Sequence, residues 1–179
     1  MQNISHHINN AIPEEYQEIA AALFLENSSL GTIDRFADVL GIGNDYKRFL
    51  AITDATEIHK RLEHFQNNLN ILIQKTWVEK ADEVRKEKLQ DRAPEFIEHI
   101  EKGDYQRALK DFNGILDELA YLFFGIQSHK EDFTEYTFRI DTQMGLFWWY
   151  GSQLASFKQT DSEHLKALLA LGICYLTNF

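Results

Sequence analysis

Residues 55–92, ATEIHKRLEHFQNNLNILIQKTWVEKADEVRKEKLQDR, decide the fold class of this chain. Their apolar residues recur in steps of mostly three and four, the period of an α-helix: Ile58, Leu62, Phe65, Leu69, Leu72, Trp77, Ala81 and Val84. Thr53 or Asp54 is expected to cap this helix. Continued to Arg92, it would be roughly 58 Å long, whereas a globule of this size is roughly 40 Å across. We therefore expect the helix to project, bend or break, with its charged end solvated.

The same helical period recurs along the rest of the chain, and strand-like alternation is hard to find. The chain is therefore predicted to be all-α: a single domain over residues 1–179, an antiparallel bundle of about five to seven helices. The prediction includes one long helix and one buried aromatic helix. Other helices are expected along the chain. The first starts at Pro13, the next runs from its cap Thr32 to Gly41, and a short one covers 46–52. Further helices run from Pro94 to Gly103, from Asp104 to about Gly125 and over about 131–157, and the last starts at Asp161.

Composition points to a soluble globular protein. The chain has 179 residues, of which 44% are apolar and 26% are charged, so it can bury a core without metal or disulfide staples. Cys174 is its one cysteine and is interpreted as a small core residue. The first residues do not resemble a signal peptide, and no apolar stretch is long enough to cross a bilayer. We expect a cytoplasmic protein that does not insert into membranes.

The charge balance is strongly acidic. Eighteen Lys and Arg face 28 Asp and Glu, which gives a net charge of −10. This charge repels nucleic-acid phosphates and favours a basic protein or a cationic ligand. The simpler alternative is that acidity only keeps the protein soluble.

One acidic ridge is the first candidate site. Glu95, Glu98 and Glu101 recur every third residue and therefore share one side of a helix. The complete candidate partner-binding set is Glu95, Glu98, Glu101, Asp104 and Asp111. A basic protein would neutralise this ridge, as expected for a non-enzymatic regulatory or inhibitor protein of the kind that immunity proteins represent. The alternative is a solvated face without a partner.

The aromatic segment over 133–157 is the second candidate site. Trp148, Trp149 and Tyr150 could form the apolar walls of a ligand pocket, with Arg139 or Asp141 as the polar anchor. We expect Asp141 to lie inside this helix, where burial would require a partner. The alternative is a core helix in which glycines interdigitate with aromatic rings. Monomer and homodimer both remain open.

Motifs for catalysis and metal binding are absent or incomplete. The chain has no phosphate-binding loop, no Cys-x-x-Cys, no His-Glu-x-x-His and no Gly-x-Ser-x-Gly. The sequence therefore favours a non-enzymatic protein and predicts no cofactor. Three histidine–carboxylate pairs have helical spacing: His59 with Glu63, Glu95 with His99, and Asp161 with His164. None completes a ligand set, so no metal is predicted, although a small-ligand- or metal-binding bundle remains the alternative function.

One hairpin has a familiar pattern, Gly103-Asp104-Tyr105-x-x-Ala108-Leu-x-x-Phe112-x-x-Ile115-Leu116. The glycine permits a tight turn, the two rings fill a groove, and the small alanine lets a second helix approach. The segment resembles the inter-helix turn and second helix of a tetratricopeptide repeat. No second copy occurs 34 residues away in either direction, so a generic helical hairpin is the other interpretation.

Overall fold

The computed structural model describes residues 12–23, 29–75, 83–124, 137, 139–154 and 161–178. These segments contain eight helices and no strand: α2 (Glu14–Leu23), α3 (Leu30–Val39), α4 (Gly43–Ala51), α5 (Ala55–Gln74), α6 (Glu83–Glu101), α7 (Tyr105–Phe124), α9 (Thr142–Gln153) and α10 (Ser162–Thr177). The predicted all-α class is confirmed, and the expected number of five to seven helices was too low. Within the described segments, no helix combines the length and apolar content needed to span a bilayer.

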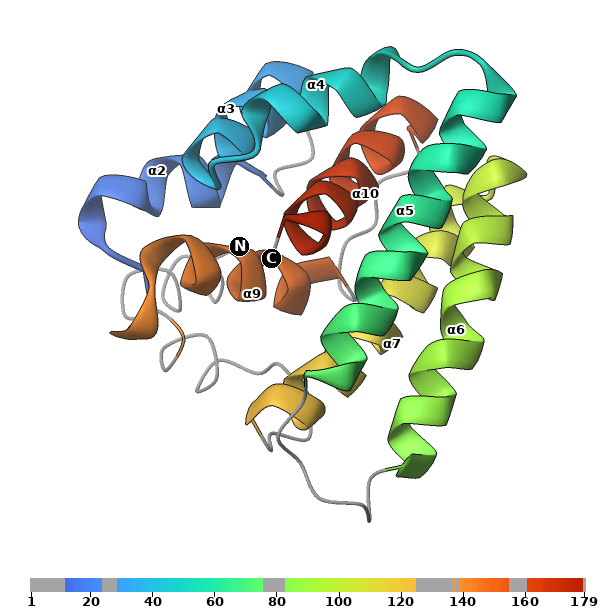
Figure 1. The fold of residues 1–179 in the computed structure, drawn as a ribbon. Helices are drawn as coiled ribbons and strands as arrows, with labels where there is room; N and C mark the ends of the chain where they lie inside the picture. Colours follow the sequence, from blue (N-terminus) through green and yellow to red (C-terminus); the bar gives the residue numbers. More distant parts are fainter. Residues whose placement is uncertain are drawn as a thin grey trace.

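The helices form two groups around a central one (Figure 1). On one side, α6 runs antiparallel to both α5 and α7, and α2, α3 and α4 lie on the other side. Helix α10 lies between them and packs against α3, α4, α5, α7 and α9. It can pack against neighbours on all sides because its ten residues from Ala167 to Leu176 are all apolar or glycine. All of these residues except Tyr175 are buried.

The long helix expected over 54–92 breaks. Helix α5 ends at Gln74, with Lys75 as its C-cap, and the next described helix begins at Glu83. Trp77 and Ala81 lie outside the described residues. The break lets α6 return along α5, so that the rings of Phe65 and Phe96 lie 5.6 Å apart. The free energy gained by burying the apolar faces of α5 and α6 against each other exceeds that gained by continuing a single helix into solvent.

Pro94 does not start a helix, which corrects the sequence prediction. It lies inside α6, on the solvent-exposed side. Proline inside a helix costs about 3 kcal/mol. Five buried residues hold α6 in place and offset this cost: Leu89, Ala93, Phe96, Ile97 and Ile100.

Most helix ends follow local sequence signals. Gly41 and Gly103 end their helices with φ of 79° and 75°, a conformation that glycine adopts without a steric penalty. Asp54 and Asp161 cap α5 and α10 as expected. The cap of α3 was assigned wrongly, because Ser29, and not Thr32, accepts the hydrogen bond from the Thr32 amide.

The aromatic helix is buried, as predicted, but it is shorter than expected. Residues 145–151 of α9 are all buried. The helix expected over 131–157 is interrupted at Asp141, whose backbone is extended and whose carboxylate caps α9. Residues 131–136 and 155–157 of the expected helix lie outside the described part of the chain.

Candidate functional site

Most carboxylates of the acidic ridge on α6 and α7 already contact basic side chains of the chain itself. Four of its five carboxylates face a basic side chain: Glu98 with Lys102 at 2.5 Å, Glu101 with His59 at 2.6 Å, Asp104 with Arg107 at 3.4 Å, and Asp111 with His99 at 2.5 Å. The hydrogen bond from Lys102 lowers the pKa of Glu98. Glu95 is exposed and makes no ion pair within the described segments. Most of the ridge is therefore not free to attract a basic partner.

The residues of the second candidate site do not come together around one pocket. Trp148, Trp149 and Tyr150 are 2%, 3% and 0% exposed, and the Tyr150 hydroxyl donates a hydrogen bond to the Leu168 carbonyl. These rings fill the core, and none of them lines the depressions described below. Arg139 and Asp141 are both exposed, so Asp141 needs no buried partner. Its Oδ1 accepts a hydrogen bond from the Met144 amide at 2.9 Å.

The histidines of the candidate metal pairs lie in ion pairs in two cases: His59 pairs with Glu63 as the spacing suggested, whereas His99 pairs with Asp111 and not with Glu95. His59 lies 3.2 Å from Glu63 and 2.6 Å from Glu101, all on the surface. The hydrogen bond to Glu101 is the main cause that raises the pKa of His59. In the part of the chain that the structure describes, no group of three or more potential ligands could hold a metal ion.

A groove between α2 and α3 has the properties that the ridge lacks. It encloses about 310 Å³, and we call it the α2–α3 groove; it is lined by Glu15, Tyr16, Glu18, Ile19, Arg35, Asp38 and Val39. Tyr16, Ile19 and Val39 form an apolar lining, since Ile19 is buried and the other two pack against the core. The charged groups of the lining are three carboxylates and one guanidinium.

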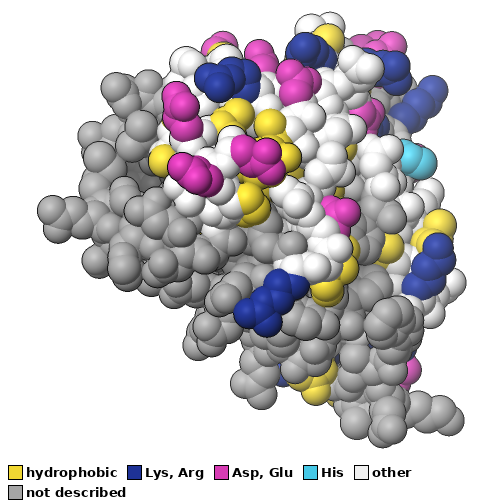
Figure 2. Space-filling view, turned by 90° about the vertical axis from the view of Figure 1, so that its left-hand side faces the viewer, with side chains coloured by type: hydrophobic (Ala, Val, Ile, Leu, Met, Phe, Trp, Pro, Cys, Tyr) yellow, Lys and Arg dark blue, Asp and Glu magenta, His cyan; other side chains and the backbone are white. Residues whose placement is uncertain are grey.

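The carboxylates of α2 and α3 have no cation of their own. Within the described segments, no ion pair involves Glu14, Glu15, Glu18, Asp34 or Asp38. Figure 2 shows acidic side chains gathered around exposed hydrophobic atoms on the face of the molecule that carries α2. Carboxylates that form no ion pair within the described segments therefore lie beside an apolar depression at this end of the molecule, together with the guanidinium of Arg35.

A sequence signal for this face exists, although no motif contains it. Residues 1–34 contain five Asp and Glu and not one Lys or Arg, and Arg35 is the first base of the chain. Glu14, Glu15 and Glu18 are fully explained as favourable charges at a helix N-terminus, so they did not suggest a site. Only the packing of α2 against α3 brings Asp38 to the same groove.

Two further depressions adjoin the groove. The first, of about 480 Å³, lies at the start of α4 and shares Asp38 with the α2–α3 groove. The second, of about 500 Å³, lies at the start of α9 and shares Gly41, Ile42 and Asn178 with the first. Gly43 makes room for the Asp38 side chain, because a β-carbon there would come within 1.9 Å of Asp38 Oδ1.

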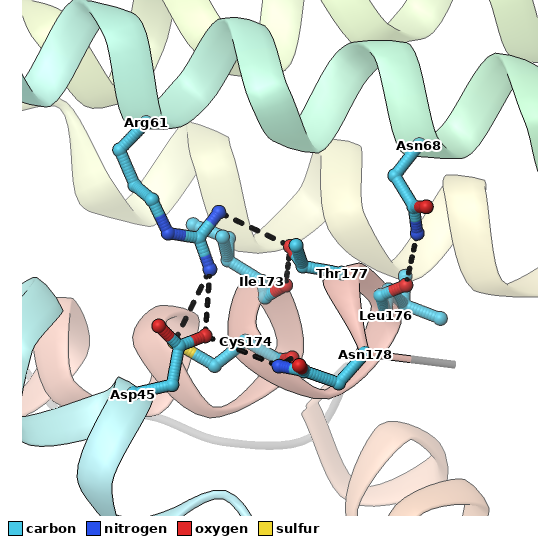
Figure 3. Close-up of polar contacts among 8 residues, drawn as sticks. All are labelled: Asp45, Arg61, Asn68, Ile173, Cys174, Leu176, Thr177 and Asn178. Atoms are coloured by element: carbon cyan, nitrogen blue, oxygen red, sulfur yellow. Dashed lines mark hydrogen bonds and ion pairs between the residues drawn. The ribbon is translucent and has the colours of Figure 1, made fainter.

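A polar network beside these depressions fixes the end of α10 (Figure 3). Arg61 of α5 donates hydrogen bonds to Asp45 of α4 at 3.0 Å and to Thr177 at 3.1 Å. Asn178 also donates to Asp45, at 3.2 Å. Asp45 is thereby neutralised within the chain and differs from Asp38 in that respect. The network joins three helices and contains no free reactive group.

Cys174 belongs to the same network and is not a nucleophile. Arg61 Nη2 lies 3.7 Å from Cys174 Sγ, a proximity that the sequence did not reveal. Burial nevertheless raises the pKa of the thiol to about 12. The side chain is fully buried and stays protonated, as expected for a core residue.

Comparisons of the chain with protein-family models, with curated proteins and with solved structures found no match. The resemblance of the hairpin at Gly103 to a tetratricopeptide repeat therefore rests on its own few residues. The function must be argued from the geometry of this chain.

Proposed function

We propose that this protein is a non-enzymatic interaction protein that binds a basic segment of another protein in the α2–α3 groove. The observation that carries the proposal is the position of Glu15, Glu18 and Asp38, which form no ion pair within the described segments and surround an apolar depression. A regulator or inhibitor of a basic protein would need such a face, because binding to it neutralises the partner's charge.

Charge complementarity favours the groove over the ridge. A partner that approached Glu98 or Glu101 would have to displace Lys102 or His59, which already form ion pairs there. A partner that approached Glu15 and Glu18 would break no ion pair within the described segments. The net charge of −10 accelerates association with any basic protein, and the unpaired carboxylates direct that association to α2 and α3.

The apolar lining supplies the affinity that surface charge cannot. Exposed ion pairs contribute only about 0.2–1 kcal/mol each. Burying one large apolar side chain contributes about 1.5–3 kcal/mol, and a depression of about 310 Å³ between Tyr16, Ile19 and Val39 has room for one. The segment that fits best carries one large apolar side chain flanked by Lys or Arg. Arg35, on the same lining, disfavours a cation at its own position.

The proposal is tested with a designed peptide of Lys and Leu residues at helical spacing. Its affinity is measured by fluorescence anisotropy for the wild-type protein and for two variants of equal net charge. Glu15→Gln with Glu18→Gln removes charge from the groove, and Glu95→Gln with Glu98→Gln removes it from the ridge. We expect the groove variant to bind about three- to tenfold more weakly, since two exposed ion pairs are lost, and the ridge variant to bind almost as the wild type does.

Equal weakening by the two variants would contradict the proposal, because it would mean that only net charge matters. A peptide of the same charge in which Ser replaces Leu serves as the control for the apolar contribution. If that peptide binds as tightly as the Lys–Leu peptide, the apolar lining of the groove plays no part.

A further inference from the structure

The depression at the start of α9 is a separate pocket, which we call the α9 pocket. It encloses about 500 Å³ and is lined by Leu40, Gly41, Ile42, Ile140, Asp141, Gln143, Met144, Tyr175 and Asn178. Its volume lies in the usual range for small-molecule sites. None of these residues lines the α2–α3 groove, so the pocket requires its own explanation.

One wall of the pocket is aromatic and held in place. The ring of Tyr175 stacks on Phe147 of α9, with centroids 4.2 Å apart and planes 20° from parallel. Met144 and Tyr175 are partly buried against the core, while Leu40 and Ile42 are buried. The pocket therefore offers a rigid aromatic face and several apolar side chains to a ligand.

The charge among the described lining residues has one sign. Of the residues in the described part of the chain that line the pocket, Asp141 is the one that carries a charge. One carboxylate oxygen of Asp141 accepts the capping hydrogen bond from the Met144 amide, and in the described part of the chain no hydrogen bond involves the other oxygen. Arg139, two residues earlier, is exposed and is not part of the lining. A carboxylate oxygen is thus available at the mouth of the pocket.

Helix ends of both signs meet at the pocket, so the carboxylate of Asp141 supplies its negative charge. Leu40 and Asn178 are the C-caps of α3 and α10, and Ile42 and Asp141 are the N-caps of α4 and α9. C-terminal helix ends carry a partial negative charge and N-terminal ends a partial positive one. The side chain of Gln143 is held beside the end of α3, because its Nε2 donates a hydrogen bond to the Val39 carbonyl at 3.2 Å.

We propose that the α9 pocket binds an alkylammonium group. The ammonium nitrogen pairs with the available oxygen of Asp141, and the alkyl chain lies along Met144 and the face of Tyr175. The carboxylate attracts the ammonium group directly and the apolar wall takes up the alkyl chain, so this combination distinguishes an amine from a neutral ligand of equal size. Both a free amine and a lysine side chain of a protein carry this group.

The test uses n-butylammonium as the probe, with n-butanol as a neutral molecule of similar size. Binding is followed by NMR through the backbone amides of residues 140–144 and 175. The key variant is Asp141→Asn, because Asn caps a helix as well as Asp does and the fold is kept. Asp161→Asn is the matched control: it removes the same charge from another exposed N-cap, that of α10, whose carboxylate accepts from Glu163 at 3.1 Å.

The expected result is saturable binding of n-butylammonium to the wild type and to Asp161→Asn, and about tenfold weaker binding to Asp141→Asn, as expected for loss of a charged partner. Tyr175→Leu should also weaken binding of the amine. Absence of saturable binding to the wild type would overturn the proposal. Equal binding to Asp141→Asn, or equal binding of n-butanol, would overturn it as well.

A second probe distinguishes the two sources of the ammonium group. Nα-acetyl-lysine methylamide carries the same head on a peptide backbone. Tighter binding of this probe than of n-butylammonium identifies the lysine of a protein as the ligand, and weaker or equal binding identifies a free amine. Both results require the binding at Asp141 that the first experiment establishes.

Discussion

Gly172 of α10 lies directly against the ring of Phe112 of α7. A β-carbon at Gly172 would come within 2.1 Å of Phe112 Cε2, a separation that real atoms do not adopt. The ring cannot move aside easily, because Phe112 is fully buried and stacks on Phe96, with ring centroids 5.5 Å apart. This contact sets how closely the central helix approaches the α5–α7 layer.

Gly172→Ala is therefore expected to lower the free energy of unfolding by about 1–3 kcal/mol, through overpacking of the core. Urea-induced unfolding followed by tryptophan fluorescence measures the change. Gly31→Ala is the control, because Gly31 is exposed, lies in a helix and has no atom closer than 3.5 Å to the added carbon. That variant should be unchanged, or stabilised by up to about 1 kcal/mol. A Gly172→Ala protein as stable as the wild type would refute the close contact.

Arg61→Ala is expected to destabilise the protein by about 1–3 kcal/mol, because it leaves Asp45 and Thr177 without their charged donor. The Arg61 side chain is only 14% exposed. Arg107→Ala is the matched control, since Arg107 also pairs with an aspartate but is 72% exposed. Its loss should cost less than about 0.5 kcal/mol. Similar unfolding midpoints for the two variants would argue against the structural role of the Arg61 network.

His164→Gln is expected to reduce the sensitivity of stability to acid. Burial lowers the pKa of His164 from its ordinary value of 6.5. As the pH falls through this value, His164 binds a proton more readily in the unfolded chain than in the folded chain, so folding is disfavoured. The loss of unfolding free energy between about pH 7.5 and about pH 5 should be smaller in the variant. An unchanged loss would contradict the prediction.

His59→Gln should change the pH dependence in the opposite sense. Glu101 raises the pKa of His59, so the folded chain holds this proton more tightly than the unfolded chain does. The resulting stabilisation is fully present below about pH 6.5 and is lost as the pH rises through the raised pKa. The variant should therefore differ from the wild type at about pH 5 and match it at about pH 9. A difference that persists at high pH would point to a contact other than this ion pair.

Cys174 is expected to resist thiol reagents in the native state. With its pKa raised to about 12, roughly one molecule in ten thousand carries the thiolate at pH 8, and the side chain is fully buried. The reaction with DTNB at pH 8 should therefore be limited by unfolding and become rapid in concentrated guanidinium chloride. Rapid modification of one thiol per folded chain would show that the cysteine is accessible.

Local signals in the sequence predicted much of the fold. Gly41 and Gly103 end helices, and Asp54 and Asp161 begin them, because a cap acts on backbone groups within three residues of itself. Pro94 shows the limit of this reasoning. Its local preference predicts a helix start, but the buried faces of α6 on both sides of it keep one helix continuous.

The candidate sites were less predictable, because they depend on which charges meet. The ridge was inferred from acidic residues at helical spacing, and its neutralisation comes partly from other helices: His59 pairs with Glu101 across 42 residues of chain. Asp141 was expected in the middle of a helix, yet it caps one, and it lines a pocket with Tyr175 of α10.

The sequence by itself determined that the chain is helical, where several helices begin or end, and that the aromatic segment is buried. These features follow from periodicity and from hydrogen bonds between near neighbours. Only the tertiary structure decided where the helix expected over 55–92 breaks, which carboxylates keep their charge unpaired, and which side chains share a pocket. Those outcomes depend on contacts between residues far apart in the chain, such as Arg61 and Cys174, which are 113 positions apart. No spacing within one helix encodes such a contact.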